Sequence, residues 1–439
     1  MKKPFIALAL LLTFFLIAGE ALAKVYIDLS APAIKKLLIA VEDFKDMGSS
    51  GADADVIKTI KAELSSALKS DLRFSDLFTA IDNQAFLDDT SKWTPGEPVD
   101  FKPWRAIGAD TLVKGAFRVE KERLTVEVRF FDCVRGTEVL AKRYIGSSAN
   151  PRRLAHYFSD HLYEELTGRK GIFTTKLLFV SDKSGSKEIY MSDYDGRNTR
   201  QITRNRSINL SPQWSPDGKK MLYTSYKRGE PHLYMLDFVT GADTLLSEKP
   251  GINISGRFSP DGEKAALTLS SEKSPELFIM DLKTKEYRRL TDNHWIDVSP
   301  AWSPDGKKIA FVSDMSGNPH IFMLDLETGG VSRLSYGGKY NSSPAWSPDG
   351  RLIAFARSEN GSVFNIWAMQ ADGGGQSQLT FDGSNKSPSW SPDGRRIVFS
   401  STARGVSSIH IMRSDGTGLT KITTGAGNEK TPAWSPYLQ

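Results

Sequence analysis

The chain has 439 residues, with 57 basic and 52 acidic side chains and a formal net charge of +5 at neutral pH. So small an excess gives no case for the clustered basic face of a nucleic-acid-binding protein, and we expect no nucleic-acid partner. The apolar fraction of 39% and the charged fraction of 25% are ordinary for a globular protein, and the length allows two or three domains.

Residues 1–23 have the pattern of a cleaved signal peptide. Lys2 and Lys3 form a positive start, an apolar run extends from Phe5 to Ala18, and Ala21-Leu22-Ala23 supplies the small residues of a cleavage site. The apolar run is shorter than the roughly 20 residues that span a bilayer as a helix. We therefore expect an exported chain whose mature form begins at Lys24.

Residues 24–170 lack any repeat and predict one small α/β domain, with a flexible N-terminal segment at 24–35. The patterns predict strands at 37–41, 111–119 and 124–134, a hairpin turn at 136–137, and helices at 52–70 and 150–168. Asn150 is expected to cap the last helix, with Pro151 in its first turn and Gly168 at its end. Cys133, the one cysteine of the chain, is expected to be buried and structural.

A 44-residue repeat built on Trp-Ser-Pro-Asp-Gly occupies residues 173–436. Its anchor positions are Trp214, Phe258, Trp302, Trp346, Trp390 and Trp434. Each period contains four strand-like runs, which is the content of one propeller blade. Residues 177–203 provide only three strands, and the missing one lies at 431–434, so we predict a closed six-bladed propeller with the anchors packed between blades.

Two polar positions repeat upstream of the anchors. The hydroxyl ring, three residues before each anchor, consists of Ser211, Ser255, Ser299, Ser343, Ser387 and Thr431. The upstream ring, five residues before each anchor, consists of Asn209, Asn253, Asp297, Asn341, Asn385 and Glu429. Positions two apart on a strand share a face, so both rings are predicted at one mouth of the channel, as a partner-binding site. The alternative is that they satisfy backbone groups of turns and strand ends.

Catalytic motifs do not stand out. The sequence has neither a Gly-x-Ser-x-Gly elbow nor a phosphate-binding glycine loop, so we expect no enzyme and no cofactor. His156 and Asp160 are four apart on a predicted helix, but a pair without a third ligand is a weak metal site, and a solvated surface is expected. Asp193-Tyr194-Asp195-Gly196 resembles the start of a calcium loop, yet its register with Asp237, Asp281 and Asp325 favours a turn. We expect no metal.

The chain resembles the TolB family, periplasmic propeller proteins of the Tol–Pal cell-envelope system. The resemblance rests on the leader, Gly108-Ala109-Asp110, Arg152 to His156 leading to Leu166-Thr167-Gly168, the blade motif, and the ending from Ala433 to Leu438. It implies a non-catalytic periplasmic scaffold that supports outer-membrane integrity and constriction during cell division.

The resemblance also implies partners. The propeller mouth would bind the peptidoglycan-associated lipoprotein Pal, and other outer-membrane lipoproteins are further candidates. The N-terminal segment would pair with TolA through Lys24, Val25, Tyr26, Ile27, Asp28 and Leu29. The chain is expected to be a monomer that meets membranes only through its partners. The alternatives are a glycan- or metal-binding periplasmic propeller and, less favoured, a propeller of the prolyl-oligopeptidase type.

Overall fold

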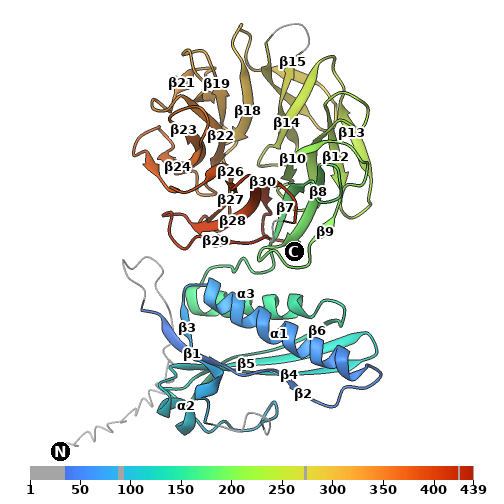
Figure 1. Ribbon diagram of the computed structural model, residues 1–439, viewed down its shortest axis with the longest axis vertical. Coiled ribbons are helices and arrows are strands. Elements are labelled where there is room, and N and C mark those ends of the chain that lie inside the picture. The colour runs from blue at the N-terminus through green and yellow to red at the C-terminus, as the bar shows by residue number, and fades with distance from the viewer. Residues whose placement is uncertain (1–34, 88–92, 271–273, 424–425, 439) are drawn as a thin grey trace, which may run out of the picture.

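The computed structural model describes residues 35–87, 93–270, 274–423 and 426–438. It shows a small α/β domain beside a six-bladed propeller (Figure 1). The predicted signal peptide and the predicted TolA-pairing residues Lys24–Leu29 lie outside the described residues. Among the helices that are described, none is long and apolar enough to cross a membrane.

The N-terminal domain is a mixed sheet covered by two long helices. Its elements are β1 (Leu37–Val41), β2 (Lys45–Asp46), α1 (Ala54–Phe74), β3 (Phe78–Ala80), the short 3₁₀ helix η1 (Asn83–Ala85), α2 (Lys102–Ala106), β4 (Thr111–Glu120), β5 (Arg123–Asp132), β6 (Thr137–Ser147) and α3 (Pro151–Thr167). The sheet has the order β3-β1-β4-β5-β6, with β2 paired to β4. Strand β1 is parallel to β3 and β4, whereas β4, β5 and β6 form an antiparallel meander.

The predicted strands and helices of this domain are confirmed. Helix α1 buries Ile60, Leu64 and Leu68 at helical spacing against the sheet. Helix α3 ends at Gly168, whose φ of 68° is the left-handed C-cap conformation. Asn150 is the N-cap residue of α3 and Pro151 stands in its first turn, as predicted, but the Asn150 side chain makes no capping hydrogen bond. Its side-chain oxygen instead accepts a hydrogen bond from Asn198.

The sheet face away from the long helices carries a second, smaller core. Trp93, Trp104, Phe131 and Cys133 pack there. The predicted burial of Cys133 is confirmed, and burial raises the pKa of its thiol to about 12, which keeps it protonated and unreactive.

The propeller consists of six four-stranded antiparallel sheets. The strands of each blade are given from the inside outward. The first blade has β30 (Glu429–Trp434), β7 (Lys176–Ser181), β8 (Glu188–Asp193) and β9 (Arg200–Gln201). The second has β10 (Asn209–Trp214), β11 (Lys220–Ser225), β12 (His232–Asp237) and β13 (Asp243–Ser247), and the third has β14 (Ile252–Phe258), β15 (Lys264–Ser270), β16 (Glu276–Asp281) and β17 (Tyr287–Arg289). The fourth has β18 (Asp297–Trp302), β19 (Lys308–Ser313), β20 (His320–Asp325) and β21 (Val331–Arg333), and the fifth has β22 (Tyr340–Trp346), β23 (Leu352–Ser358), β24 (Asn365–Gln370) and β25 (Ser377–Gln378). The sixth has β26 (Ser384–Trp390), β27 (Arg396–Ala403), β28 (Val406–Arg413) and β29 (Thr420–Lys421).

The ring closes as predicted. Strand β30, near the C-terminal end of the chain, pairs with β7, and the register joins Trp434 to Leu177. The first and last parts of the array therefore share one blade, so this blade, like the other five, has its innermost strand.

The anchor tryptophans connect neighbouring blades, which confirms their predicted place. An indole N–H donates to the backbone carbonyl of the residue just before the anchor of the preceding blade. These bonds are Trp214 to Ala433 at 3.1 Å, Trp302 to Arg257 at 3.2 Å, Trp346 to Ala301 at 3.2 Å and Trp390 to Ala345 at 3.0 Å. Apolar packing by itself does not fix the orientation of a side chain, and each of these hydrogen bonds fixes the orientation of an indole ring between two blades.

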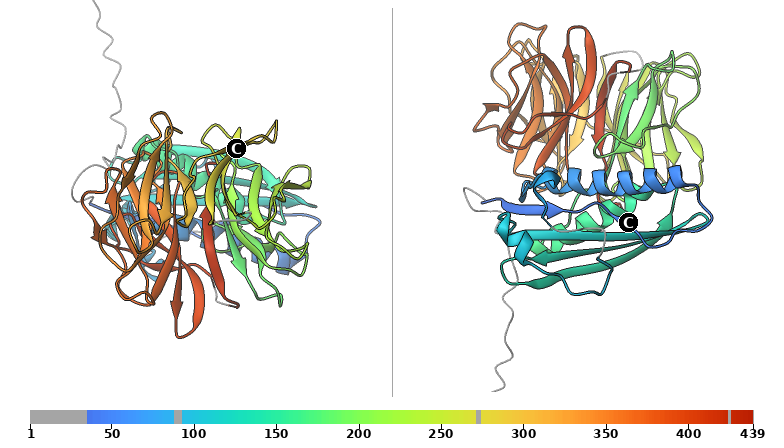
Figure 2. Two further views of the ribbon diagram at one scale, coloured as in Figure 1. Left: turned by 90° about the horizontal axis from the view of Figure 1, so that it is seen from above. Right: turned by 60° about the horizontal axis from the view of Figure 1, so that its bottom comes forward.

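The two domains meet at one end of the blades (Figure 2). Arg396 and Arg413 bind Asp76 at the end of α1, and Arg152 of α3 binds Asp195 in the β8–β9 turn. Apolar side chains of both domains also form one continuous core there, which includes Leu68, Phe173, Tyr194 and Trp434. These contacts come from the blade ends that carry the Ser-Pro-Asp-Gly turns. The loops that precede the innermost strands lie at the opposite end.

Candidate binding site at the propeller channel

The hydroxyl ring occupies a strained backbone position. Each of its six residues has a left-handed φ, between 48° at Thr431 and 60° at Ser255. In every innermost strand the pairing register shifts at this point, as between Leu210 and Gln213. Left-handed conformations cost residues other than glycine about 1–2 kcal/mol and gather at functional sites. Six in one ring therefore identify it as a candidate site.

The same six residues line a cavity of about 340 Å³ at the centre of the ring of innermost strands. Other parts of its wall come from the residues just before the anchors and from the anchors themselves, including Gln213, Arg257, Ala301, Ala345, Ser389, Trp302, Trp346 and Trp390. The hydroxyl ring thus faces the channel. That it binds a protein partner stays a prediction.

The upstream ring does not share that face, and this part of the sequence prediction was wrong. Its six residues, Asn209, Asn253, Asp297, Asn341, Asn385 and Glu429, are at most 3% exposed. The register shift at the hydroxyl ring interrupts the two-residue alternation on which the prediction relied.

The upstream ring instead holds the loops that lead into the innermost strands. Asn341 donates to the Gly337 carbonyl at 2.8 Å and to His320 Nδ1 at 2.9 Å. Asn253 donates to the Lys249 carbonyl at 2.7 Å, and Asp297 accepts from Asn293 at 2.8 Å. The alternative role, satisfaction of polar groups near turns and strand ends, therefore describes the upstream ring.

Exposed apolar residues stand immediately before three members of the upstream ring. Ile208, Ile296 and Tyr340 are 41%, 48% and 40% exposed, and the neighbouring Trp295 is 36% exposed. They lie at the blade end opposite the N-terminal domain. Sequence reasoning missed them, although an apolar residue recurring directly before the repeated amide or carboxylate was a usable signal. Exposed apolar and aromatic side chains of this kind anchor protein partners.

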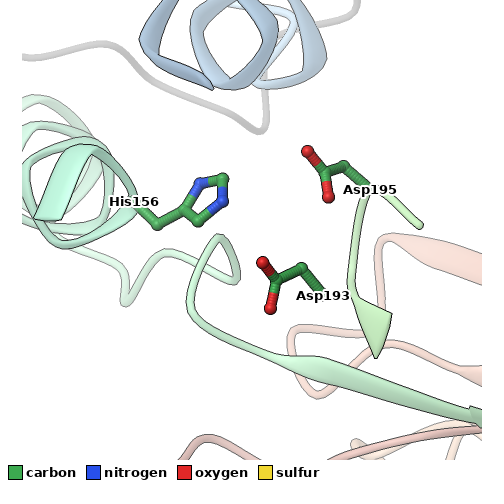
Figure 3. A group of neighbouring side chains, drawn as sticks. All are labelled: His156, Asp193 and Asp195. Carbon is green, nitrogen blue, oxygen red and sulfur yellow. The ribbon is translucent and has the colours of Figure 1, made fainter. Parts of the chain in front are cut away.

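A cluster of titratable side chains lies at the domain junction (Figure 3). His156 of α3 faces Asp193 and Asp195 at the end of β8, and one possible ligand atom of each lies within 4.8 Å of the others. Each of the three already has an ionic partner: Asp193 binds Lys176, Asp195 binds Arg152, and His156 Nδ1 lies 2.8 Å from Asp71. The cluster is therefore an ion-pair network that joins the domains.

The prediction that His156 and Asp160 lie on a solvated helix surface was wrong. His156 is 2% exposed because α3 packs against both the sheet and the propeller. Asp160 accepts hydrogen bonds from the backbone N–H groups of Phe173 and Thr174 and from the Thr174 hydroxyl, so it holds the connection between the domains. Burial raises the pKa of Asp160 to about 6, against the effect of these hydrogen bonds.

The predicted turn role is confirmed for three of the four aligned aspartates. Asp237, Asp281 and Asp325 each accept hydrogen bonds from the backbone N–H groups two and three residues later. Asp193 differs, because its carboxylate binds Lys176 and Asn198 at the domain junction. The aspartate at this repeat position therefore binds side chains, rather than turn N–H groups, in a blade that contacts the N-terminal domain.

Together, the fold and the channel define a two-domain propeller protein whose open channel mouth faces away from its α/β domain. The TolB β-propeller domain family matches residues 163–438, and the TolB amino-terminal domain family matches residues 25–139. The chain belongs to the TolB family.

Individual relatives agree with this assignment. The Tol-Pal system protein TolB of Geobacter metallireducens is 43% identical over 195 residues, which are 44% of each chain. The protein of the same name from Syntrophotalea carbinolica is 41% identical over 213 residues, 48% of each chain. The matches thus span about half the length of these curated relatives. The crystal structure of TolB from Acinetobacter baumannii is 27% identical, with a TM-score of 0.77 over 94% of this chain and 98% of that chain.

Proposed function

We propose that this protein is a non-catalytic periplasmic scaffold of the Tol–Pal system. The observation that carries the proposal is the similarity of both domains, in the same order, to TolB across nearly the whole of a solved TolB chain. Curated relatives at 43% and 41% identity also bear the name of a Tol-Pal system protein. Outer-membrane integrity and constriction during division are the processes in which the scaffold would act.

The channel supports the non-catalytic part of the proposal. Its hydroxyl groups resemble nucleophiles only in type, because a serine needs an adjacent base to become reactive. Among the residues that line the described channel, none is a histidine, an aspartate, a glutamate or a lysine. Ring hydroxyls without such a base are suited to hydrogen bonding rather than to acyl transfer.

Pal would bind at the channel mouth opposite the N-terminal domain. Ile208, Ile296 and Tyr340 offer apolar contact area there, and the hydroxyl ring behind them offers hydrogen-bond donors and acceptors. Because the N-terminal domain contacts the other blade ends, a partner reaches this mouth without displacing it. TolA would pair with Lys24–Leu29, whose alternating pattern suits addition to a sheet edge.

Isothermal titration with purified Pal tests the first partner. Ile296→Glu should weaken Pal binding at least about tenfold, since it places a charge in an apolar contact. Val239→Glu is the matched control, because Val239 is an exposed apolar residue, 75% accessible, in the β12–β13 turn at the other blade end. Equal affinities of the two variants would move the interface elsewhere. Binding of a glycan or Ca²⁺ without binding of Pal would support the alternative, a glycan- or metal-binding propeller.

Deletion of residues 24–30 tests the second partner. The shortened protein should keep its melting temperature and lose association with TolA in a pull-down, while its affinity for Pal persists. Retained TolA association would contradict the assignment of this segment, and a large fall in melting temperature would show that the segment supports the fold.

A further inference from the structure

Arg257 carries a positive charge in the wall of the propeller channel. The other residues lining the cavity are of the types Ser, Thr, Gln, Pro, Ala, Phe and Trp, so no carboxylate stands opposite it there. Within the part of the chain that the structure describes, its guanidinium makes one hydrogen bond, from Nη1 to the Gly256 carbonyl at 3.3 Å. A guanidinium has five N–H groups, so most of its donors are free for a ligand.

The surroundings keep this charge and leave room beside it. Burial lowers the pKa of Arg257 to about 10, which still leaves the side chain protonated at neutral pH. At the same repeat position, Ala301, Ala345 and Ser389 are small, whereas Gln213 is long and uncharged; all four also line the cavity. In three blades the arginine therefore has short counterparts, and the space that they leave open is next to a partly desolvated cation, where an anion is attracted more strongly than in water.

The hydroxyl ring adds neutral donors. Within the described residues, none of its six hydroxyls has a hydrogen-bond partner, and Thr431 Oγ1 is buried without one. At the mouth, Lys386 and Lys430 are exposed and stand directly before ring members Ser387 and Thr431. Partial burial and the nearby charge of Lys430 lower the pKa of Lys386, whose ammonium group lies 4.0 Å from the centre of the Phe364 ring. A cationic mouth draws anions toward the channel.

We propose that the propeller channel is a binding site for a compact oxyanion, a carboxylate or a phosphate group, held by Arg257 and by hydroxyls of the ring. Charge-assisted bonds from a forked guanidinium suit either group. Hydroxyls and carbonyls also bind cations, but the fixed charge of Arg257 repels a cation from the same cavity. The site does not depend on which protein occupies the mouth.

Titration of the full chain with citrate and, separately, with inorganic phosphate tests the proposal. Calorimetry measures affinity, and intrinsic fluorescence is a second readout, because three of the nine tryptophans, Trp302, Trp346 and Trp390, line the cavity. We expect saturable binding of at least one of the two anions together with a change in tryptophan fluorescence. The stronger ligand of the two tells whether carboxylate or phosphate is preferred.

Variants show whether Arg257 is responsible. Arg257→Gln should lower the affinity about tenfold or more, and Arg257→Lys, which keeps the charge but loses the fork, should lower it less. Arg228→Gln is the control, because Arg228 is exposed and pairs with Glu248 outside the channel. This variant should bind the anion with the affinity of the wild type. The absence of saturable binding to the wild-type protein would overturn the proposal, as would an unchanged affinity in folded Arg257→Gln.

Discussion

Trp302 donates its indole N–H to the backbone carbonyl of Arg257, 3.2 Å away in the preceding blade, while the Arg257 side chain extends into the channel. One residue position thus serves both the joint between two blades and the wall of the candidate site. The strand geometry explains this, because the carbonyl faces the neighbouring blade and the side chain faces the axis. The anchor repeat therefore fixes the position of the channel residues.

Replacement of Trp346 by phenylalanine should destabilise the propeller by about 1–2 kcal/mol, because the Ala301 carbonyl loses its indole donor. The fold itself should persist, since Phe258 occupies the same repeat position naturally. Denaturant unfolding measures the change. Trp295→Phe is the control: this tryptophan is 36% exposed, and its loss should cost less than about 0.5 kcal/mol. Equal losses in both variants would show that the interblade bond contributes nothing.

Replacement of Thr431 by glycine should stabilise the protein by about 1 kcal/mol. The residue is β-branched at a φ of 48°, and its buried hydroxyl has no partner among the described residues, so glycine relieves both costs. Lys430→Gly, at the neighbouring exposed position, should instead lose about 0.5–1 kcal/mol from backbone entropy. Thermal unfolding of the two variants gives the comparison. A loss of stability in Thr431→Gly would mean that the left-handed position carries no strain.

Replacement of Asp76 by asparagine should weaken the domain junction by about 2–3 kcal/mol, since it removes the charge that Arg396 and Arg413 bind. Asparagine tolerates the left-handed φ of 64° at this position, so the backbone is unaffected. Limited proteolysis of the connection between the domains measures the opening. Asp292→Asn, which alters an exposed pair with Arg289, is the control and should change nothing measurable.

The Asp76 junction should also weaken in acid. Burial alone would raise the pKa of Asp76, but the hydrogen bonds and charges of Arg413 and Arg396 outweigh it and hold the pKa well below its ordinary value of 3.8. A carboxylate with a lowered folded pKa contributes stability above its unfolded pKa and loses it as the pH falls. Wild-type stability should therefore decline below about pH 4, and Asp76→Asn should decline less over the same interval.

Replacement of His156 by glutamine should remove a pH dependence of the stability that the wild type shows as the pH rises above 6.5. Burial alone would lower the pKa of His156, but the Asp71 carboxylate, aided by Asp195 and Asp193, raises it above its ordinary value of 6.5. The stabilisation from this pair is complete below pH 6.5 and is lost as the pH rises through the folded pKa. Melting temperatures across this range should fall for the wild type and stay level for His156→Gln. Parallel curves would contradict the assignment.

The repeat alone determined most of the fold. Six anchors at one spacing predict six blades, and the missing strand at residue 177 with the spare one at Trp434 predicts the closure that β30 and β7 make. Patterns of this kind are local, because the side-chain alternation of a strand and the apolar spacing of a helix are written within a few neighbouring residues. The elements of the N-terminal domain were predictable for the same reason.

The tertiary structure alone decided the orientation of the polar rings and the chemistry of the junction. A bulge at Ser343 turns its neighbour Asn341 toward the blade interior, and residue spacing does not reveal such a bulge. His156 meets Asp71 across 85 residues because α3 packs against α1, and Arg413 meets Asp76 across 337 because the two domains dock in one particular way. Sequence periodicity specifies each blade and helix, but contacts between them depend on distances through space that no local pattern encodes.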